Sequence, residues 1–169
     1  MEPVTSSGKA KVTLPSDEEI LITREFDAPR HLVYRAWTTP ELVMRWWSGR
    51  RGAMKVADID LRVGGMWRYV MEANGGFEVA FHGEYREIVP DERIVTTEVY
   101  EMPGAEPPAA ADEPLNIIDF AERDGRTTLT LLVQCSSKEL RDTIIDSGME
   151  AGMQEGMDLL EEVAVSLRL

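Results

Sequence analysis

Two kinds of apolar pattern take turns along the chain. Residues 19–26 alternate between apolar and polar positions, which predicts a strand. Apolar residues at helical spacing over 30–37, and again after Pro40, predict two short helices. Residues 53–135 return to alternation, and residues 138–169 return to helical spacing. The order is therefore strand, two short helices, a group of strands and a helical C-terminal segment.

Turn signals divide the central region into strands. Asn74-Gly75 and Asp124-Gly125 accept the positive φ angles that tight hairpin turns require. The run 103–114, rich in Pro and Ala, predicts a long exposed loop because proline cannot pair inside a sheet. The remaining segments predict antiparallel strands at 53–60, 65–73, 76–89, 92–102, 114–123 and 126–135.

The C-terminal segment predicts a short helix over 138–146 and a long amphipathic helix after a break at Gly148. Met149, Met153 and Met157 lie four residues apart, so one face of the long helix is buried. Antiparallel strands with such a helix predict an α+β fold in which the helix covers one face of the sheet. A sheet curled around a helix can enclose a cavity.

Length and charge limit the range of possible functions. The 169 residues suit one domain, which we expect over 18–169, after a mobile N-terminal arm at 1–17. Eighteen Lys and Arg against 31 Asp and Glu give a net charge of -13, so we expect neither nucleic-acid nor membrane partners. One cysteine and the absence of signal-peptide features favour the cytoplasm. His31, His82 and Cys135 lie far apart, so we expect no metal site.

Several motifs occur in a fixed order: REFDAP at 24–29, VYRAWT at 33–38, PEL at 40–42, WW at 46–47, DLRVGGMWRY at 60–69, FHGEYREIVPDER at 81–93 and DGRTTLT at 124–130, then Gly152, Gly156 and Leu159-Leu160. Together they resemble the SRPBCC (START-like) superfamily, in the subgroup of the C-terminal domain of the activator of the ninety-kilodalton heat-shock-protein ATPase. The resemblance covers about residues 19–167.

This resemblance implies a helix-grip fold, in which a curved antiparallel sheet of about six to seven strands wraps around the long C-terminal helix. It also implies two short helices after the first strand, homodimers in many relatives and no obligatory cofactor. Many relatives hold a small apolar molecule in a cavity. The full co-chaperone makes its main chaperone contact through a further N-terminal domain without a counterpart in these motifs, so we do not expect a chaperone contact.

The candidate site is the inner face of the sheet and the helix face opposite it. Glu87 shares the parity of Phe81 and Tyr85, so it would place a carboxylate inside, where burial raises the pKa. A structural ion pair is the other interpretation, and a bulge near Gly83 would turn Glu87 outward. An ordinary solid core remains the alternative for each aromatic residue. The predicted ligand-binding residues are Trp47, Trp67, Tyr69, Phe81, Tyr85, Glu87, Phe120, Met149, Met153 and Met157.

Three functions remain open at this point. The leading hypothesis is a protein that binds an apolar or aromatic metabolite in a cavity between the sheet and the long helix. A polyketide cyclase or dehydratase-like enzyme would need an inward acid-base residue, and the catalytic residues are unknown. A co-chaperone-like interaction domain would need an exposed apolar patch, for which Trp46 and Trp47 are the candidates. We expect a binding protein rather than an enzyme.

Overall fold

The computed structural model describes residues 10–101 and 112–168. Residues 1–9 of the predicted arm and most of the predicted loop 103–114 lie outside this range. The described elements are β1 (Lys11–Thr13), β2 (Glu19–Phe26), α1 (Arg30–Thr38), α2 (Pro40–Val43), β3 (Gly52–Ile59), β4 (Met66–Ala73), β5 (Glu78–Val89), β6 (Arg93–Thr97), β7 (Val99–Glu101), β8 (Leu115–Arg123), β9 (Arg126–Gln134), α3 (Lys138–Asp146) and α4 (Met149–Ser166).

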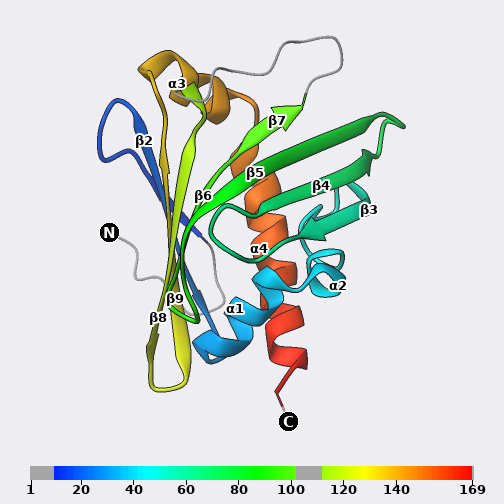
Figure 1. The fold of residues 1–169 in the computed structure, drawn as a ribbon, viewed down its shortest axis with the longest axis vertical. Helices are drawn as coiled ribbons and strands as arrows, with labels where there is room; N and C mark the ends of the chain where they lie inside the picture. Colours follow the sequence, from blue (N-terminus) through cyan, green and yellow to red (C-terminus); the bar gives the residue numbers. More distant parts are fainter. Residues whose placement is uncertain (1–9, 102–111, 169) are drawn as a thin grey trace.

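The strands form one antiparallel sheet that curls around the long helix. Its order is β1-β2-β9-β8-β6-β5-β4-β3. β6 pairs with the second half of β5, and β7 pairs with its first half, from Ala80 to His82. Figure 1 shows α4 crossing the concave side of the sheet, with α1 and α2 near its C-terminal half. The predicted α+β architecture is thus present, with both short helices following β2.

The sheet contains nine described strands, two more than the seven predicted segments. The first addition is β1, which lies in the segment predicted as an arm and pairs with β2. The second arises because the predicted strand 92–102 divides at Glu98. Before this residue β6 pairs with β8, and after it β7 pairs with β5 alone among the described strands.

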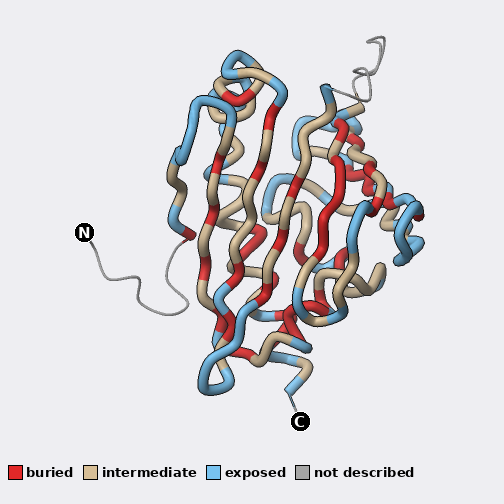
Figure 2. Tube along the Cα trace, turned by 60° about the vertical axis from the view of Figure 1, so that its left-hand side comes forward, coloured by how far each residue is buried: buried red, intermediate tan, exposed pale blue. Residues whose placement is uncertain are grey.

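Burial alternates along the strands, as a sheet with one covered face requires. In β2, Ile20, Ile22, Arg24 and Phe26 are buried and the residues between them are half-buried. Figure 2 shows this alternation along the strands of the sheet. The inward side chains meet the buried face of α4, which begins after Gly148 in the left-handed conformation (φ 84°). The predicted break between the two C-terminal helices is therefore confirmed.

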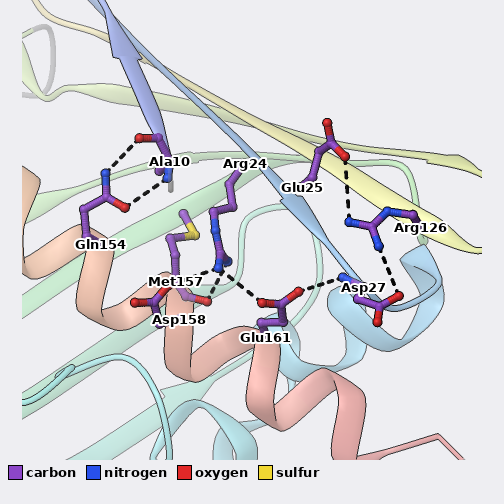
Figure 3. Close-up of polar contacts among 9 residues, drawn as sticks. All are labelled: Ala10, Arg24, Glu25, Asp27, Arg126, Gln154, Met157, Asp158 and Glu161. Carbon is purple, nitrogen blue, oxygen red and sulfur yellow. Dashed lines mark hydrogen bonds and ion pairs between the residues drawn. The ribbon is translucent and has the colours of Figure 1, made fainter. Parts of the chain in front are cut away.

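One buried arginine fixes α4 against β2. Arg24 is 1% exposed, and its guanidinium donates to the carbonyl oxygen of Met157 at 3.0 Å. It also donates to Asp158 at 3.0 Å and to Glu161 at 3.3 Å, as Figure 3 shows. The second carboxylate oxygen of Glu161 accepts from the backbone of Asp27 at 2.8 Å. These bonds connect the end of β2 to the middle of the helix.

Two further contacts hold α4 along its length. The amide of Gln154 makes paired hydrogen bonds of 2.9 and 2.8 Å with the backbone of Ala10, just before β1 (Figure 3). Glu155 contacts the segment between α2 and β3, because it accepts from the backbone of Arg50 at 3.2 Å and pairs with Arg51 at 3.4 Å. The helix is therefore anchored from both ends of the sheet order.

Candidate functional site

The inward aromatic side chains form two separate clusters. The first, here called the sheet cluster, joins β4, β5 and β7 to the segment after α2. Trp47 meets Tyr69 and Phe81 edge to face at 5.2 and 5.0 Å between ring centroids. Phe81 stacks on Tyr100 at 5.0 Å with the planes 29° apart. The members are Trp47, Trp67, Tyr69, Phe81 and Tyr100.

The second cluster contains Phe120, which the sequence analysis grouped with the first. Its ring meets Tyr34 at 5.5 Å and Trp37 at 6.3 Å, both on α1. Trp37 also packs on Trp46 at 4.9 Å. Among the ring pairs of the described chain, none joins this α1 cluster to the sheet cluster. Phe120 therefore belongs to the packing beneath α1.

The sheet cluster has a buried end and an accessible end. Trp67 and Tyr69 are buried, whereas Trp47 and Phe81 are half-buried and Tyr100 is 46% exposed. The predicted helix residues follow the same gradient, because Met157 is buried while Met149 and Met153 are half-buried against the core. Tyr85 is buried in the same core.

Gly83 explains how Trp67 reaches its position. The two residues pair across β4 and β5, and a Cβ on Gly83 would lie 2.5 Å from Nε1 of the indole. The same Cβ would lie 1.9 Å from the carbonyl oxygen of Thr97, so no larger residue fits without moving the backbone. The indole Nε1 then donates to the hydroxyl of Thr96 at 2.7 Å. Glycine here allows the tryptophan and β6 to approach the strand closely.

The prediction that Glu87 points inward is wrong. The register between β5 and β6 shifts between Tyr85 and Glu87, so Arg86 is an extra residue in β5. Tyr85 lies inside, opposite Thr96, but Glu87 lies opposite Val95 and is exposed. This bulge reverses the alternation on which the prediction depended.

The chain and its fold are similar to known proteins. A family model described as "Activator of Hsp90 ATPase homolog 1-like protein" matches residues 27–164. The chain belongs to the Activator of Hsp90 ATPase homolog 1-like family. The resemblance found in the sequence is thereby confirmed. Proteins of this superfamily commonly bind hydrophobic ligands.

Solved structures show the same fold. A crystal structure of a Rhodobacter sphaeroides protein matches with a TM-score of 0.83 at 22% identity, covering 95% of this chain and 100% of that chain. A Mycobacterium smegmatis protein matches with a TM-score of 0.80 at 23% identity, covering 98% and 100%. An AHSA1-like protein from Aeromonas hydrophila gives 0.61 at 19% identity, covering 86% and 92%. The comparison with curated proteins gave no match. The helix-grip prediction is confirmed.

A carboxylate that was not predicted from the sequence lies beside the sheet cluster. Glu98, between β6 and β7, accepts a hydrogen bond from Nδ2 of the buried Asn116 at 2.6 Å. Loss of hydration raises the pKa of Glu98, and the hydrogen bond from Asn116 opposes this shift. Burial raises the pKa of Tyr69 well above its usual value, and the charge of Glu98 adds to that increase. The sequence signal was the shared parity of Ile94, Thr96 and Glu98.

Both histidines lie away from the sheet cluster. His82 is on the other face of β5, where its Nδ1 lies 2.7 Å from Glu101. Glu101 also accepts two hydrogen bonds of 2.9 Å from Arg68. Hydrogen bonds from Arg68 and His82 lower the pKa of Glu101 to about 2. His31 is exposed on α1. Neither histidine reaches the inner face, where an acid-base catalyst would act.

The two best-defined hollows of the described chain do not lie at the sheet cluster. The two best-defined hollows measure about 400 Å³, beside Glu87 and Phe120, and about 350 Å³, beside Cys135. Within residues 10–101 and 112–168, His, Cys, Asp and Glu do not gather into a group of three or more that could hold a metal ion. In the same range no helix has the length and apolar character to span a membrane.

Trp46 and Trp47 do not form the exposed patch that an interaction domain would need. Trp46 is buried, and its indole Nε1 donates to the carbonyl oxygen of Ala36 at 2.9 Å. Trp47 turns the other way and packs into the sheet cluster. The two neighbouring tryptophans thus belong to different aromatic clusters.

Proposed function

We propose that this protein binds a small apolar or aromatic metabolite at the accessible end of the sheet cluster, against the first half of α4. The supporting observation is the stacked pair of Phe81, half-buried, and Tyr100, 46% exposed. An exposed aromatic residue alone is ordinary, but this one continues a row of inward aromatic rings. Such walls with few polar groups are typical of small-molecule sites.

The methionines support the same proposal. Met149 and Met153 are half-buried at the start of α4, whereas Met157, one turn further, is buried. Their unbranched thioether side chains can change rotamer to fit ligands of different shape. The proposed ligand therefore lies between rigid rings and an adaptable helix face. We further propose that binding occurs in the cytoplasm and that the protein forms a homodimer.

The two alternative functions receive less support. An enzyme of the kind predicted would need an inward acid-base residue. The candidates named from the sequence, Glu87 and both histidines, lie outside the sheet cluster, which leaves Glu98 as the carboxylate beside it. A co-chaperone-like domain would expose Trp46 and Trp47, which instead pack inside. We therefore propose binding without chemistry.

The test is titration with Nile red, a neutral dye whose fluorescence emission increases in apolar surroundings and reports binding. We expect saturable binding by the wild-type protein. Tyr100→Ala removes one stacked ring, and such contacts contribute about 0.5–1.5 kcal/mol, so the Kd should rise about two- to twelvefold. Native mass spectrometry of protein purified from its own host then identifies any metabolite that stays bound.

Phe77→Ala is the matched control, because Phe77 is 59% exposed but belongs to neither aromatic cluster. It should leave the Kd for Nile red unchanged. Equal effects of the two substitutions would place the dye elsewhere, and absence of saturable binding together with a clean apo mass would contradict the proposed function.

A further inference from the structure

One carboxylate on the inner face of the sheet lacks a charged partner. Oε1 of Glu98 accepts from Asn116 at 2.6 Å. Asn116 pairs in register with Thr96, whose hydroxyl accepts from the indole of Trp67. Glu98 therefore lies beside the sheet cluster, two residues from Tyr100 along an extended chain, or about 7 Å.

The described protein groups leave the charge of Glu98 and the hydrogen-bonding capacity of its Oε2 without a partner. Within residues 10–101 and 112–168, no cationic side chain forms an ion pair with Glu98, and no group donates a hydrogen bond to Oε2. The hydroxyl of Tyr69, whose pKa is raised chiefly by burial and also by the charge of Glu98, likewise has no hydrogen-bond partner in that range. By contrast, buried Arg24 has two carboxylates and a carbonyl oxygen.

The Glu98 side chain is half-buried, so its carboxylate loses part of its hydration without an ion pair to compensate, and this loss raises its pKa. A ligand that brings a positive charge would compensate for the lost hydration through a charge-assisted hydrogen bond. Aromatic ring faces nearby also attract cations. The net charge of -13 favours the approach of a cationic ligand over an anionic one.

We propose that Glu98 is the charged anchor of the binding site and that the ligand is an apolar or aromatic amine. Its ammonium group donates to Oε2 of Glu98, while its apolar body lies against Phe81 and Tyr100. Asn116 holds the carboxylate in place through Oε1. This inference rests on the proposed function, because it names the class of molecule that the sheet cluster takes.

The test compares two probes with the same ring system, 2-(1-naphthyl)ethylamine and 2-(1-naphthyl)ethanol, by isothermal titration calorimetry at neutral pH. The wild-type protein should bind the amine at least tenfold more tightly than the alcohol, because a hydrogen bond to a charged group exceeds a neutral one by about that amount. Glu98→Gln keeps the shape and an oxygen for Asn116, and it should reduce the ratio to below threefold.

Glu87→Gln is the matched control, since it removes one negative charge from the exposed outer face of the same region. It should keep the preference for the amine. Equal binding of both probes by the wild-type protein would overturn the inference while leaving apolar binding intact. Equal loss of preference in both variants would overturn it too, because the effect would then be one of net charge. Binding of neither probe would contradict the proposed function itself, and the anchor with it.

Discussion

Replacement of Arg24 by methionine tests whether the buried guanidinium stabilises the helix against the sheet. Methionine keeps an unbranched apolar stem near Phe26, whose ring centroid lies 4.8 Å from the guanidinium carbon, so the change creates little empty space. It removes the bonds to Met157, Asp158 and Glu161. Arg24→Met should therefore lower the free energy of unfolding.

The magnitude follows from the exposure of the partners. Hydrogen bonds to charged groups contribute about 1.5–3 kcal/mol each when protected from water. The Asp158 carboxylate is 47% exposed, so its bond counts for less than about 1 kcal/mol, whereas the Glu161 side chain is only 12% exposed. Removal of the arginine also ends its own desolvation cost, which leaves a net loss of about 3 kcal/mol. For a chain of this size the Tm should fall by about 6–12 °C.

Circular dichroism of urea and thermal unfolding measures both quantities. Lys138→Met is the control, because Lys138 pairs with Asp142 at 2.8 Å on the exposed side of α3, and the loss of a solvent-exposed pair should leave the unfolding midpoint nearly unchanged. If Arg24→Met matched or exceeded the wild-type stability, the reasoning would fail. The ion pairs would then only orient the helix, as buried charges can do without stabilising the fold.

Three further predictions concern backbone and charge. Gly83→Ala should destabilise the fold by about 3 kcal/mol and quench or shift the Trp67 emission, since the new Cβ would meet the Thr97 backbone at 1.9 Å. In the control Gly75→Ala the new Cβ meets only the Phe77 ring, so this change should cost under about 1 kcal/mol in the same urea titration. Gly152→Ala should raise the free energy of unfolding by about 1 kcal/mol, because alanine favours a helix interior and the new Cβ would meet Arg51 at an ordinary 3.7 Å. Gly148→Ala should lower it by about 1–2 kcal/mol, because φ is +84° at this position. Reversed signs would contradict the helix geometry. Glu101 has a folded pKa of about 2, below its unfolded value, so its contribution is present above about pH 4.5 and lost as the pH falls toward 2. The stability difference between wild type and Glu101→Gln should shrink over that window, and a constant difference would show that the Arg68 contact does not act through charge.

The periodicity of the sequence predicted most elements because each strand has one covered face. Along β2 the buried positions alternate without interruption, so local pattern and tertiary burial agree. β1 was not predicted, because Lys11–Thr13 is too short for a pattern. Its place depends on Gln154, which bonds Ala10 from 144 positions away in the sequence. Such a contact has no local signature.

The candidate site was predicted only in part, and its two failures have different causes. Glu87 was assigned inward because parity was carried through Arg86, and a single extra residue reverses every later position. Glu98 had the correct parity, with Thr96 two positions before it, but an acidic residue in a strand reads as solvent-facing until its partner Asn116 is known. Helical spacing did place Met149, Met153 and Met157 on the inner side of α4.

The anchoring of α4 divides the molecule into a fixed part and an adjustable part. Gln154 and Arg24 attach the helix to the first strands, and Glu155 attaches it to the segment before β3. A change in ligand size therefore cannot be met by sliding this helix without breaking charged contacts. The side chains of Met149 and Met153 take no part in these contacts, whereas β7 is held by the bonds of Glu101 to Arg68 and His82. Sequence variation that changes ligand choice among relatives should accordingly concentrate at the methionines, while the anchoring residues limit what can change.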